Sequence, residues 1–381
     1  MCRLDTVAAA NRLQSAFSEI LTEPSDIGGG GAAVALWQND RCILSLYGGD
    51  SSPGNPWRAH TPSLIWSASK GIAAACILHS LQEKGVSLET PVSTLWSEFA
   101  ASGKKQITLA ELLSHRAGLA AIDQRGLSLS DHSSVVAALA AQPPNWKLDT
   151  NGASRHGYGA RTFGFLLDEI IRRVAGEPLS SYWNSAFREP LALDLWFGLP
   201  EAQLSLAATI IAPKAPPQPS DFSRAFANPA SLTRRALSEP GGLLSPSIMN
   251  TPAMRMASIP SLGVIATADS LARFYAILAG SNVFFTQKTL SNMQETLSRG
   301  LDLTLLEETS FSAGFMTNEM GVYGPGRRCF GHPGAGGSLA FADPQHGFGF
   351  AFIPSAMHPG ALPGRRTRKL VQALYGINQE A

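Results

Sequence analysis

A serine and a lysine three residues apart stand at the head of an apolar stretch of the chain. Ser67 and Lys70 are followed by small and aliphatic residues up to Leu78. Residues three apart lie on the same face of a helix, with Cβ atoms about 5 to 6 Å apart, so the two side chains can meet. An amine buried against such a helix loses its proton more easily and can then accept the serine proton. The segment predicts a nucleophilic serine activated by a lysine, with the amides of the helix N-terminus facing an oxyanion.

The Ser-x-x-Lys pattern alone is a weak signal, because Ser102 and Lys105 have the same spacing. This second pair lies in a polar turn with two lysines and has no helix of small residues behind it, so we expect it to be solvated. Ser67 taken in isolation could equally be a helix cap. Further motifs must therefore decide between the two interpretations of Ser67.

Three segments together resemble the serine β-lactamase-related family. The first is Ser67-Ala68-Ser69-Lys70, the second is Ile-Thr-Leu-Ala-Glu-Leu-Leu-Ser-His-Arg-Ala-Gly-Leu at residues 107–119, and the third is Gly-His-Pro-Gly-Ala-Gly-Gly-Ser-Leu-Ala-Phe-Ala-Asp-Pro at residues 331–344. The resemblance covers nearly the whole chain and is greatest to the branch of class C β-lactamases and family VIII carboxylesterases. It implies a penicillin-binding-protein-like fold, in which helices flank an antiparallel sheet and an all-helical lobe is inserted. The Ser-Asp-Asn and Lys-Thr-Gly motifs of class A lactamases and penicillin-binding proteins are absent.

Two tyrosines compete for the family's second catalytic element, which is usually Tyr-x-Asn. Tyr182-Trp183-Asn184 matches literally, but it follows the helix that ends at Gly176, where relatives carry a structural aromatic residue. Tyr158 lacks the asparagine but directly precedes that helix, where relatives place their catalytic tyrosine. We therefore assign Tyr158, although it could also be a buried ring with a bonded hydroxyl. Burial beside Lys70 would favour a phenolate able to act as a base.

The family's third element, Lys-Thr-Gly in lactamases, corresponds here to His332, Pro333 and Gly334, which resembles the histidine variants of the esterase branch. Pro333 offers neither a hydroxyl nor an N–H group, and a near-neutral imidazole replaces a permanent cation. Both changes weaken recognition of a substrate carboxylate. They favour a neutral ester over an anionic β-lactam or peptide terminus. His332 alone could instead be an ordinary histidine of an edge strand.

The glycines after His332 would let the backbone approach a substrate closely, so Pro333, Gly334 and Gly336 are the expected substrate-binding residues. By family position, the Ala335 amide pairs with the Ser67 amide as the oxyanion hole. The resemblance thus implies a serine hydrolase that cleaves carboxylic esters or amides of small molecules through an acyl-enzyme. Tyr158 and Lys70 stay open as the general base, and His332 orients either the tyrosine or the leaving group.

The elements that must position these residues come from both ends of the chain. Residues 33–37 and 42–47 are short apolar stretches joined by a polar turn, and residues 338–342 and 347–353 are joined in the same way. An amphipathic helix is predicted over residues 6–21 and a basic helix over residues 365–375. We therefore expect an α/β fold of the α+β type, with an antiparallel sheet flanked by N- and C-terminal helices.

Between the two ends the sequence predicts a mostly helical insertion. Apolar positions at residues 163–174 precede Gly176, which suits a helix C-terminus, and Thr108 and Glu111 form a capping box for a helix that ends near Gly118. Prolines predict an irregular surface loop at residues 212–219. We expect one catalytic domain, residues 1–381, with an α/β lobe at residues 1–85 and 305–381 and a mainly helical lobe at residues 86–304.

Composition excludes several classes of protein. Of 381 residues, 44% are hydrophobic and 15% charged, and 30 Lys and Arg balance 29 Asp and Glu, which argues against a disordered chain or a nucleic-acid partner. No apolar run approaches the roughly 18 residues of a membrane span. Scattered cysteines and the absence of a visible export signal predict reduced thiols and a cytoplasmic location. His79, His115, His132 and His156 lack paired ligand spacing, so we expect neither a metal nor a cofactor.

The same residues leave other functions open. Within enzymes these are β-lactam hydrolysis, cleavage of D-amino-acid peptides, and acyl transfer to an alcohol or amine instead of water. From a different class comes a non-catalytic binding or self-assembling scaffold, which the missing asparagine after Tyr158 supports. The sequence does not give the oligomeric state.

Overall fold

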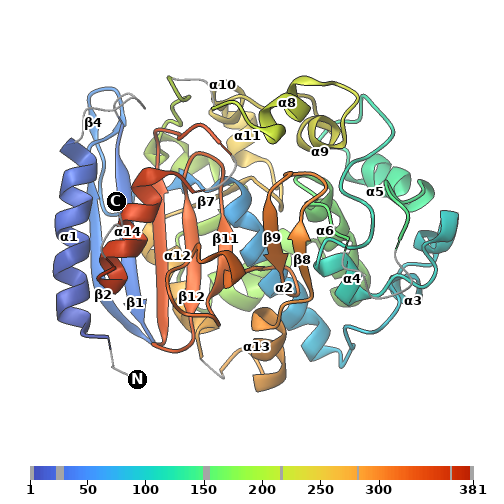
Figure 1. Cartoon of the computed structure of the whole chain (residues 1–381), viewed down its shortest axis with the longest axis horizontal. Helices are drawn as coiled ribbons and strands as arrows, with labels where there is room; N and C mark the ends of the chain where they lie inside the picture. Colours follow the sequence, from blue (N-terminus) through green and yellow to red (C-terminus); the bar gives the residue numbers. More distant parts are fainter. Residues whose placement is uncertain are drawn as a thin grey trace.

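The computed structural model describes residues 4–22, 30–148, 155–214, 218–280, 283–360 and 363–377. Its main sheet consists of the strands β1 Ala32–Gln38, β2 Arg41–Gly48, β8 Ser298–Leu301, β9 Glu308–Phe311, β10 Met316–Thr317, β11 Phe330–Pro333, β12 Leu339–Asp343 and β13 Phe348–Pro354. They are ordered β2-β1-β13-β12-β11-β10-β9-β8, and every neighbouring pair is antiparallel. The two predicted hairpins are therefore present and lie side by side in one sheet (Figure 1).

The two faces of the sheet are covered by different helices. Helices α1 (Thr6–Thr22) and α14 (Arg365–Tyr375) cover one face, where they pack on large side chains such as Phe341, Phe350 and Phe352. Alternate residues on the other face are small, including Ala340 and Ala351, and they pack in the cluster that contains α12 (Ala268–Leu278). This alternation follows from the two-residue period of a strand.

The small residues let α12 approach the sheet very closely. A Cβ atom added to Gly349 in β13 would lie 2.0 Å from the Ala272 carbonyl oxygen and 2.1 Å from the Ala276 nitrogen. Helix backbone therefore touches strand backbone at this point, and only glycine fits there. This contact fixes the distance between α12 and the main sheet.

A second, three-stranded sheet carries the Ser67 turn. It has the order β5-β7-β6, with β5 Ser63–Leu64, β6 Leu195–Phe197 and β7 Val264–Ala266. A 3₁₀ turn η1 (Trp66–Ala68) follows β5 and runs directly into α2 (Ser69–Glu83), most of which is buried. A short hairpin of β3 (Asp50–Ser52) and β4 (Asn55–Pro56) precedes this unit.

The middle of the chain is mainly helical, and α3 to α6 gather at the end of the molecule opposite α1 (Figure 1). The helices not yet given are α3 Val92–Leu95, η2 Ser97–Gly103, α4 Leu109–Leu113, α5 His132–Ala141, α6 Thr162–Ala175, α7 Leu179–Trp183, η3 Asn184–Arg188, η4 Glu201–Leu206, α8 Asp221–Ala227, α9 Leu232–Ser238, α10 Pro246–Met249, α11 Pro252–Met256, α13 Gln287–Gln294 and η5 Asn318–Met320.

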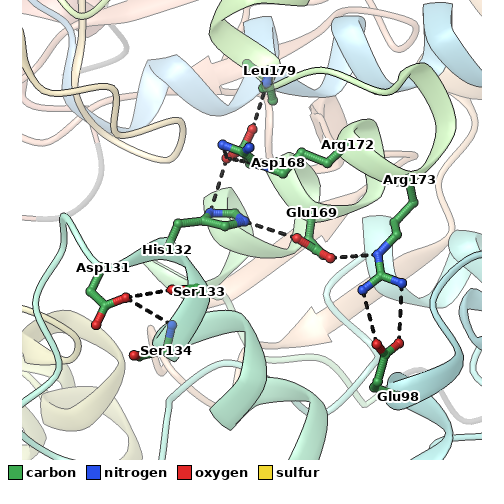
Figure 2. Close-up of polar contacts among 10 residues, drawn as sticks. All are labelled: Glu98, Asp131, His132, Ser133, Ser134, Asp168, Glu169, Arg172, Arg173 and Leu179. Carbon is green, nitrogen blue, oxygen red and sulfur yellow. Dashed lines mark hydrogen bonds and ion pairs between the residues drawn. The ribbon is translucent and has the colours of Figure 1, made fainter.

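A polar network joins the start of α5 to α6. Both ring nitrogens of His132 face carboxylates, with Nδ1 3.2 Å from Asp168 and Nε2 3.1 Å from Glu169. Glu169 in turn accepts a hydrogen bond from Arg173, which also reaches Glu98 (Figure 2). Carboxylates on α6 thus hold a histidine at the N-terminus of α5, and this cluster is a structural tie between helices.

Most predicted elements agree with the structure, and one helix ends earlier than predicted. Thr108 does form a capping box with Glu111, but α4 ends at Leu113, short of the predicted Gly118. The predicted lobe boundary at residue 304 separates β8 from its partner β9, and α12, from within residues 86–304, packs against the main sheet. The division into lobes stays a prediction. Of the proline-rich loop, residues 215–217 lie outside the described residues.

Candidate active site

Ser67 lies on a tight turn that the small sheet holds in place. The Ile65 amide donates to the Val264 carbonyl, and the Val264 amide donates to the Ser69 hydroxyl, which itself bonds to the Trp66 carbonyl. Trp66 has a φ of 50°, an unusual left-handed conformation for a bulky residue. Strained backbone persists where its surroundings over-determine it, often at functional positions. The turn leaves Ser67 partly exposed among buried neighbours.

Lys70 is completely buried and points at Ser67. Its Nζ atom donates to the carbonyl oxygens of Ala160 and Ser261, each at 2.8 Å, and lies 3.4 Å from Ser67 Oγ. Burial lowers the pKa of Lys70 well below its ordinary value of 10.5, and the charge of Arg161 lowers it further. A neutral amine has two hydrogens and one lone pair. With both hydrogens bound to carbonyls, the lone pair is left for the serine proton.

Tyr158 lies across from this pair and is also buried. Its ring centroid is 4.7 Å from Lys70 Nζ, and the ring stacks on Phe311. The hydroxyl has no partner within hydrogen-bond geometry among the described residues, although the Ser67 side chain is near enough to lower the pKa of the phenol. Burial dominates and raises the pKa of Tyr158 above its ordinary value of 10. The expectation that burial would favour a phenolate is therefore wrong, because desolvation penalises the charged form.

His332 lies in β11 beside Tyr158, with ring centroids 5.7 Å apart. Its Nδ1 atom is 2.7 Å from the Pro333 carbonyl oxygen, which can only accept, so Nδ1 carries the proton. Burial, followed by the charge of Lys70, lowers the pKa of His332 to about 3. The ring is therefore neutral, and Nε2 presents a lone pair with no partner among the described residues. At Nε2, His332 can therefore accept a hydrogen bond in the site but cannot donate one.

The loop after β11 is docked on the backbone that leads into the Ser67 turn. The Ser338 hydroxyl donates to the Ile65 carbonyl at 2.8 Å, and a Cβ atom on Gly334 would lie 2.2 Å from that same oxygen. Ala335 and Ser67 are both partly exposed, and neither amide has a recorded acceptor in the part of the chain that the structure describes. Two free amides on adjoining turns are what an oxyanion hole requires.

Two predicted substrate-binding glycines are needed for packing. Gly334 is pressed against Ile65, and a Cβ atom on Gly336 would lie 2.6 Å from Met357 Cγ. Gly336 also has a φ of +80°, which disfavours other residues. Pro333 is buried and forms the last position of β11. Contact of these three residues with a substrate stays a prediction.

The alternative tyrosine lies elsewhere. The Tyr182 hydroxyl contacts His79 Nδ1 at 2.7 Å, on a part of α2 remote from Lys70. The second Ser-x-x-Lys pair is exposed at both Ser102 and Lys105. Among the described residues no group of three or more His, Cys, Asp or Glu side chains is arranged to hold a metal. None of the helices in the described ranges is long and apolar enough to cross a membrane.

Sequence reasoning missed several groups that shape the site. The carbonyls of Ala160 and Ser261 orient the amine, Ser69 fastens the turn, and Arg161 acts electrostatically on Lys70. Asp302 accepts hydrogen bonds from the Tyr158 amide. Carbonyl acceptors carry no sequence signal, and the other residues gain their roles only through contacts between distant segments.

An antiparallel sheet with flanking helices and a Ser-x-x-Lys pair, with its lysine buried, facing a tyrosine defines the class of β-lactamase-related and penicillin-binding-protein-like serine hydrolases. The chain belongs to the beta-lactamase family, whose sequence pattern it matches over residues 17–374.

Individual relatives carry esterase and penicillin-binding names. The esterase/beta-lactamase LipL of Mycobacterium tuberculosis is 30% identical over 341 residues, which cover 85% of this chain and 76% of that protein. A crystal structure of a penicillin-binding protein homologue from Caulobacter crescentus matches with a TM-score of 0.86 at 30% identity, covering 97% of this chain and 98% of that one. A family VIII carboxylesterase matches with a TM-score of 0.85 at 28% identity, covering 97% and 98%. The chain is thus a hydrolase of the β-lactamase and esterase family with esterase relatives.

Proposed function

We propose that the protein is a carboxylesterase that cleaves neutral esters of small molecules through an acyl-enzyme on Ser67. One observation carries the proposal. The buried Lys70 amine donates to two carbonyl oxygens, and the position left for its lone pair faces Ser67 Oγ, 3.4 Å away. An amine held in this way serves as a base without any neighbouring carboxylate. Lys70 is therefore the proposed base, and a Tyr158 of raised pKa is the proposed proton relay.

In the proposed reaction Ser67 Oγ attacks the ester carbonyl carbon while its proton passes to Lys70. The amides of Ser67 and Ala335 bind the tetrahedral oxyanion. Collapse breaks the bond to the alcohol oxygen, which receives the proton from Lys70 through the Tyr158 hydroxyl. Water then attacks the acyl carbon and gives its proton to Lys70. Lys70 returns that proton to Ser67 as the acid leaves.

The preference for an ester rests on the chemistry of β11. His332 is neutral, Pro333 has no hydroxyl or N–H group, and both replace groups that hold a substrate carboxylate in lactamases. A neutral His332 accepts a hydrogen bond at Nε2, so its proposed role is to orient the Tyr158 hydroxyl. Residues beside the oxyanion loop, such as Trp66 and Met357, belong to an apolar cluster that suits an uncharged acyl group.

The test compares hydrolysis of p-nitrophenyl acetate and butyrate with hydrolysis of nitrocefin, followed by intact mass spectrometry to detect an acylated protein. We expect ester turnover far above lactam turnover and an acyl mass adduct, both lost in Ser67→Ala. Ser102→Ala is the matched control, because it removes the serine of the exposed second Ser-x-x-Lys pair. Faster nitrocefin turnover would favour a lactamase, products that depend on an added alcohol or amine an acyltransferase, and no turnover or adduct a scaffold.

A cytoplasmic location remains a proposal. Its support is that Cys42, Cys76 and Cys329 are free thiols in the part of the chain that the structure describes, with two of them buried. Reduced, unpaired cysteines are usual in reducing compartments.

A further inference from the structure

Asp302 is a fully buried carboxylate that the proposed chemistry leaves unused. It follows β8 and has no exposed surface. Its oxygens accept hydrogen bonds from the amides of Thr304 at 2.8 Å and Leu305 at 2.9 Å, and from the Thr309 hydroxyl at 3.3 Å. Its recorded ion-pair contact is His156 at 3.7 Å. Burying a carboxylate costs several kcal/mol unless hydrogen bonds offset it, so a buried Asp302 needs a structural or functional explanation.

Asp302 also accepts hydrogen bonds from the backbone of the proposed catalytic tyrosine. The Tyr158 amide donates to both carboxylate oxygens, each at 3.1 Å, across 144 residues of sequence. The amides on either side of Tyr158 bond to a different residue. Gly157 donates to the His115 carbonyl, and Gly159 donates to His115 Nδ1. The segment that bears Tyr158 has no helix or strand to hold it. Its position therefore depends on these hydrogen bonds to other segments.

The position of the Tyr158 ring relative to Lys70 and Ser67 matters for proton transfer. The ring centroid lies 4.7 Å from Lys70 Nζ, and the Ser67 side chain is near enough to the phenol to lower its pKa, so a displacement of the ring would remove the phenol from the proposed proton path. A misplacement of about 1 Å can cost about 10²-fold in rate. The negative charge of Asp302 also opposes ionisation of the phenol, which keeps the tyrosine a proton donor.

We infer that Asp302 is a positioning residue of this hydrolase, which holds the Tyr158 backbone through its carboxylate and thereby sets the phenol against Ser67 and Lys70. The inference rests on the proposed function and deepens it. Asparagine has the same shape, but its amide group can accept at only one atom and presents hydrogens to the Tyr158 or Thr309 donors. Asp302→Asn should therefore weaken the hydrogen bonds to the Tyr158 amide without leaving a cavity in the core.

A double-mutant cycle tests this inference in the full chain. With p-nitrophenyl butyrate, Asp302→Asn should lower kcat about 10²-fold with KM nearly unchanged. In a Tyr158→Phe background the same change should alter kcat by no more than about twofold, because the group through which Asp302 acts is already absent. A purely structural role would give equal losses in both backgrounds. The rate at which a fluorophosphonate labels Ser67 should follow the same pattern.

Asp343→Asn is the matched control. Asp343 is another fully buried carboxylate that accepts backbone N–H bonds, and it contacts His346 and Tyr375 far from Ser67. Its replacement carries a similar folding penalty and should leave kcat unchanged once circular dichroism confirms a folded variant. Equal effects of Asp302→Asn with and without the Tyr158 hydroxyl, or an unchanged kcat, would overturn the inference. If Ser67 is labelled with the expected coupling but no ester is hydrolysed, the proposed function fails while the positioning role stands.

Discussion

The pH dependence of acylation tests the central feature of the site, a lysine that works as a neutral base. Burial lowers the pKa of Lys70 well below 10.5, and the nearby Arg161 charge lowers it further. The base is active only when deprotonated. The acylation rate should therefore rise with pH through the depressed pKa of Lys70 and then level off.

The expected size of the effect follows from a single titrating proton. Each pH unit below the pKa reduces the reactive fraction about tenfold, equivalent to about 1.4 kcal/mol. With a lysine of ordinary pKa, the acylation rate would rise tenfold per pH unit up to about pH 10.5, whereas with the buried Lys70 it should reach its plateau at a much lower pH. Because a like charge disfavours an ammonium ion, replacing Arg161 with glutamine should move the rising limb to higher pH, with a smaller effect on the plateau.

The assay is single-turnover acylation by p-nitrophenyl butyrate across the range of about pH 5 to 10, where such limbs are resolved. Arg255→Gln is the matched control, because Arg255 is a partly buried arginine that also donates to backbone carbonyls, those of Leu204, Ala207 and Ala208, away from Lys70. It should leave the limb in place. Two results would refute the neutral-base reasoning. One is a wild-type acylation rate that still climbs tenfold per pH unit near pH 10, and the other is an Arg161→Gln variant whose rising limb is not shifted to higher pH.

Three further outcomes are expected. Tyr158→Phe should lower kcat for esters by about 10² to 10⁴-fold through loss of the proton relay, whereas Tyr182→Phe, which removes only a contact with the part-buried His79, should change it little. Gly349→Ala should destabilise the fold by roughly 1 to 3 kcal/mol in denaturant unfolding, because the new Cβ meets the backbone of α12 at 2.0 Å, whereas Gly280→Ala meets nothing within 4 Å and should be neutral. Unfolded chains bind a proton at Lys70 that the buried amine lacks, so between the depressed folded pKa and 10.5 the free energy of unfolding of the wild type should rise with pH relative to Lys70→Met; a constant or falling difference would contradict a depressed pKa.

Local chemistry made several elements predictable from the sequence. The pairing of Ser67 with Lys70 depends only on three-residue spacing in one helical segment, and the capping box at Thr108 depends on four consecutive residues. The left-handed Gly176 that ends α6 was readable for the same reason. Such features are set by dihedral preferences and by hydrogen bonds between near neighbours, which the order of residues specifies directly.

The tertiary structure alone decided what these groups can do. Lys70 is a base because Ser261, 191 residues away, and Ala160 supply carbonyl oxygens, and because the surrounding core removes water from the amine. The same burial raises the pKa of Tyr158, the opposite of the sequence-based expectation. Desolvation and contacts between distant segments depend on how the whole chain packs. The sequence by itself determined which chemical groups are available, and packing determined their protonation states and their partners.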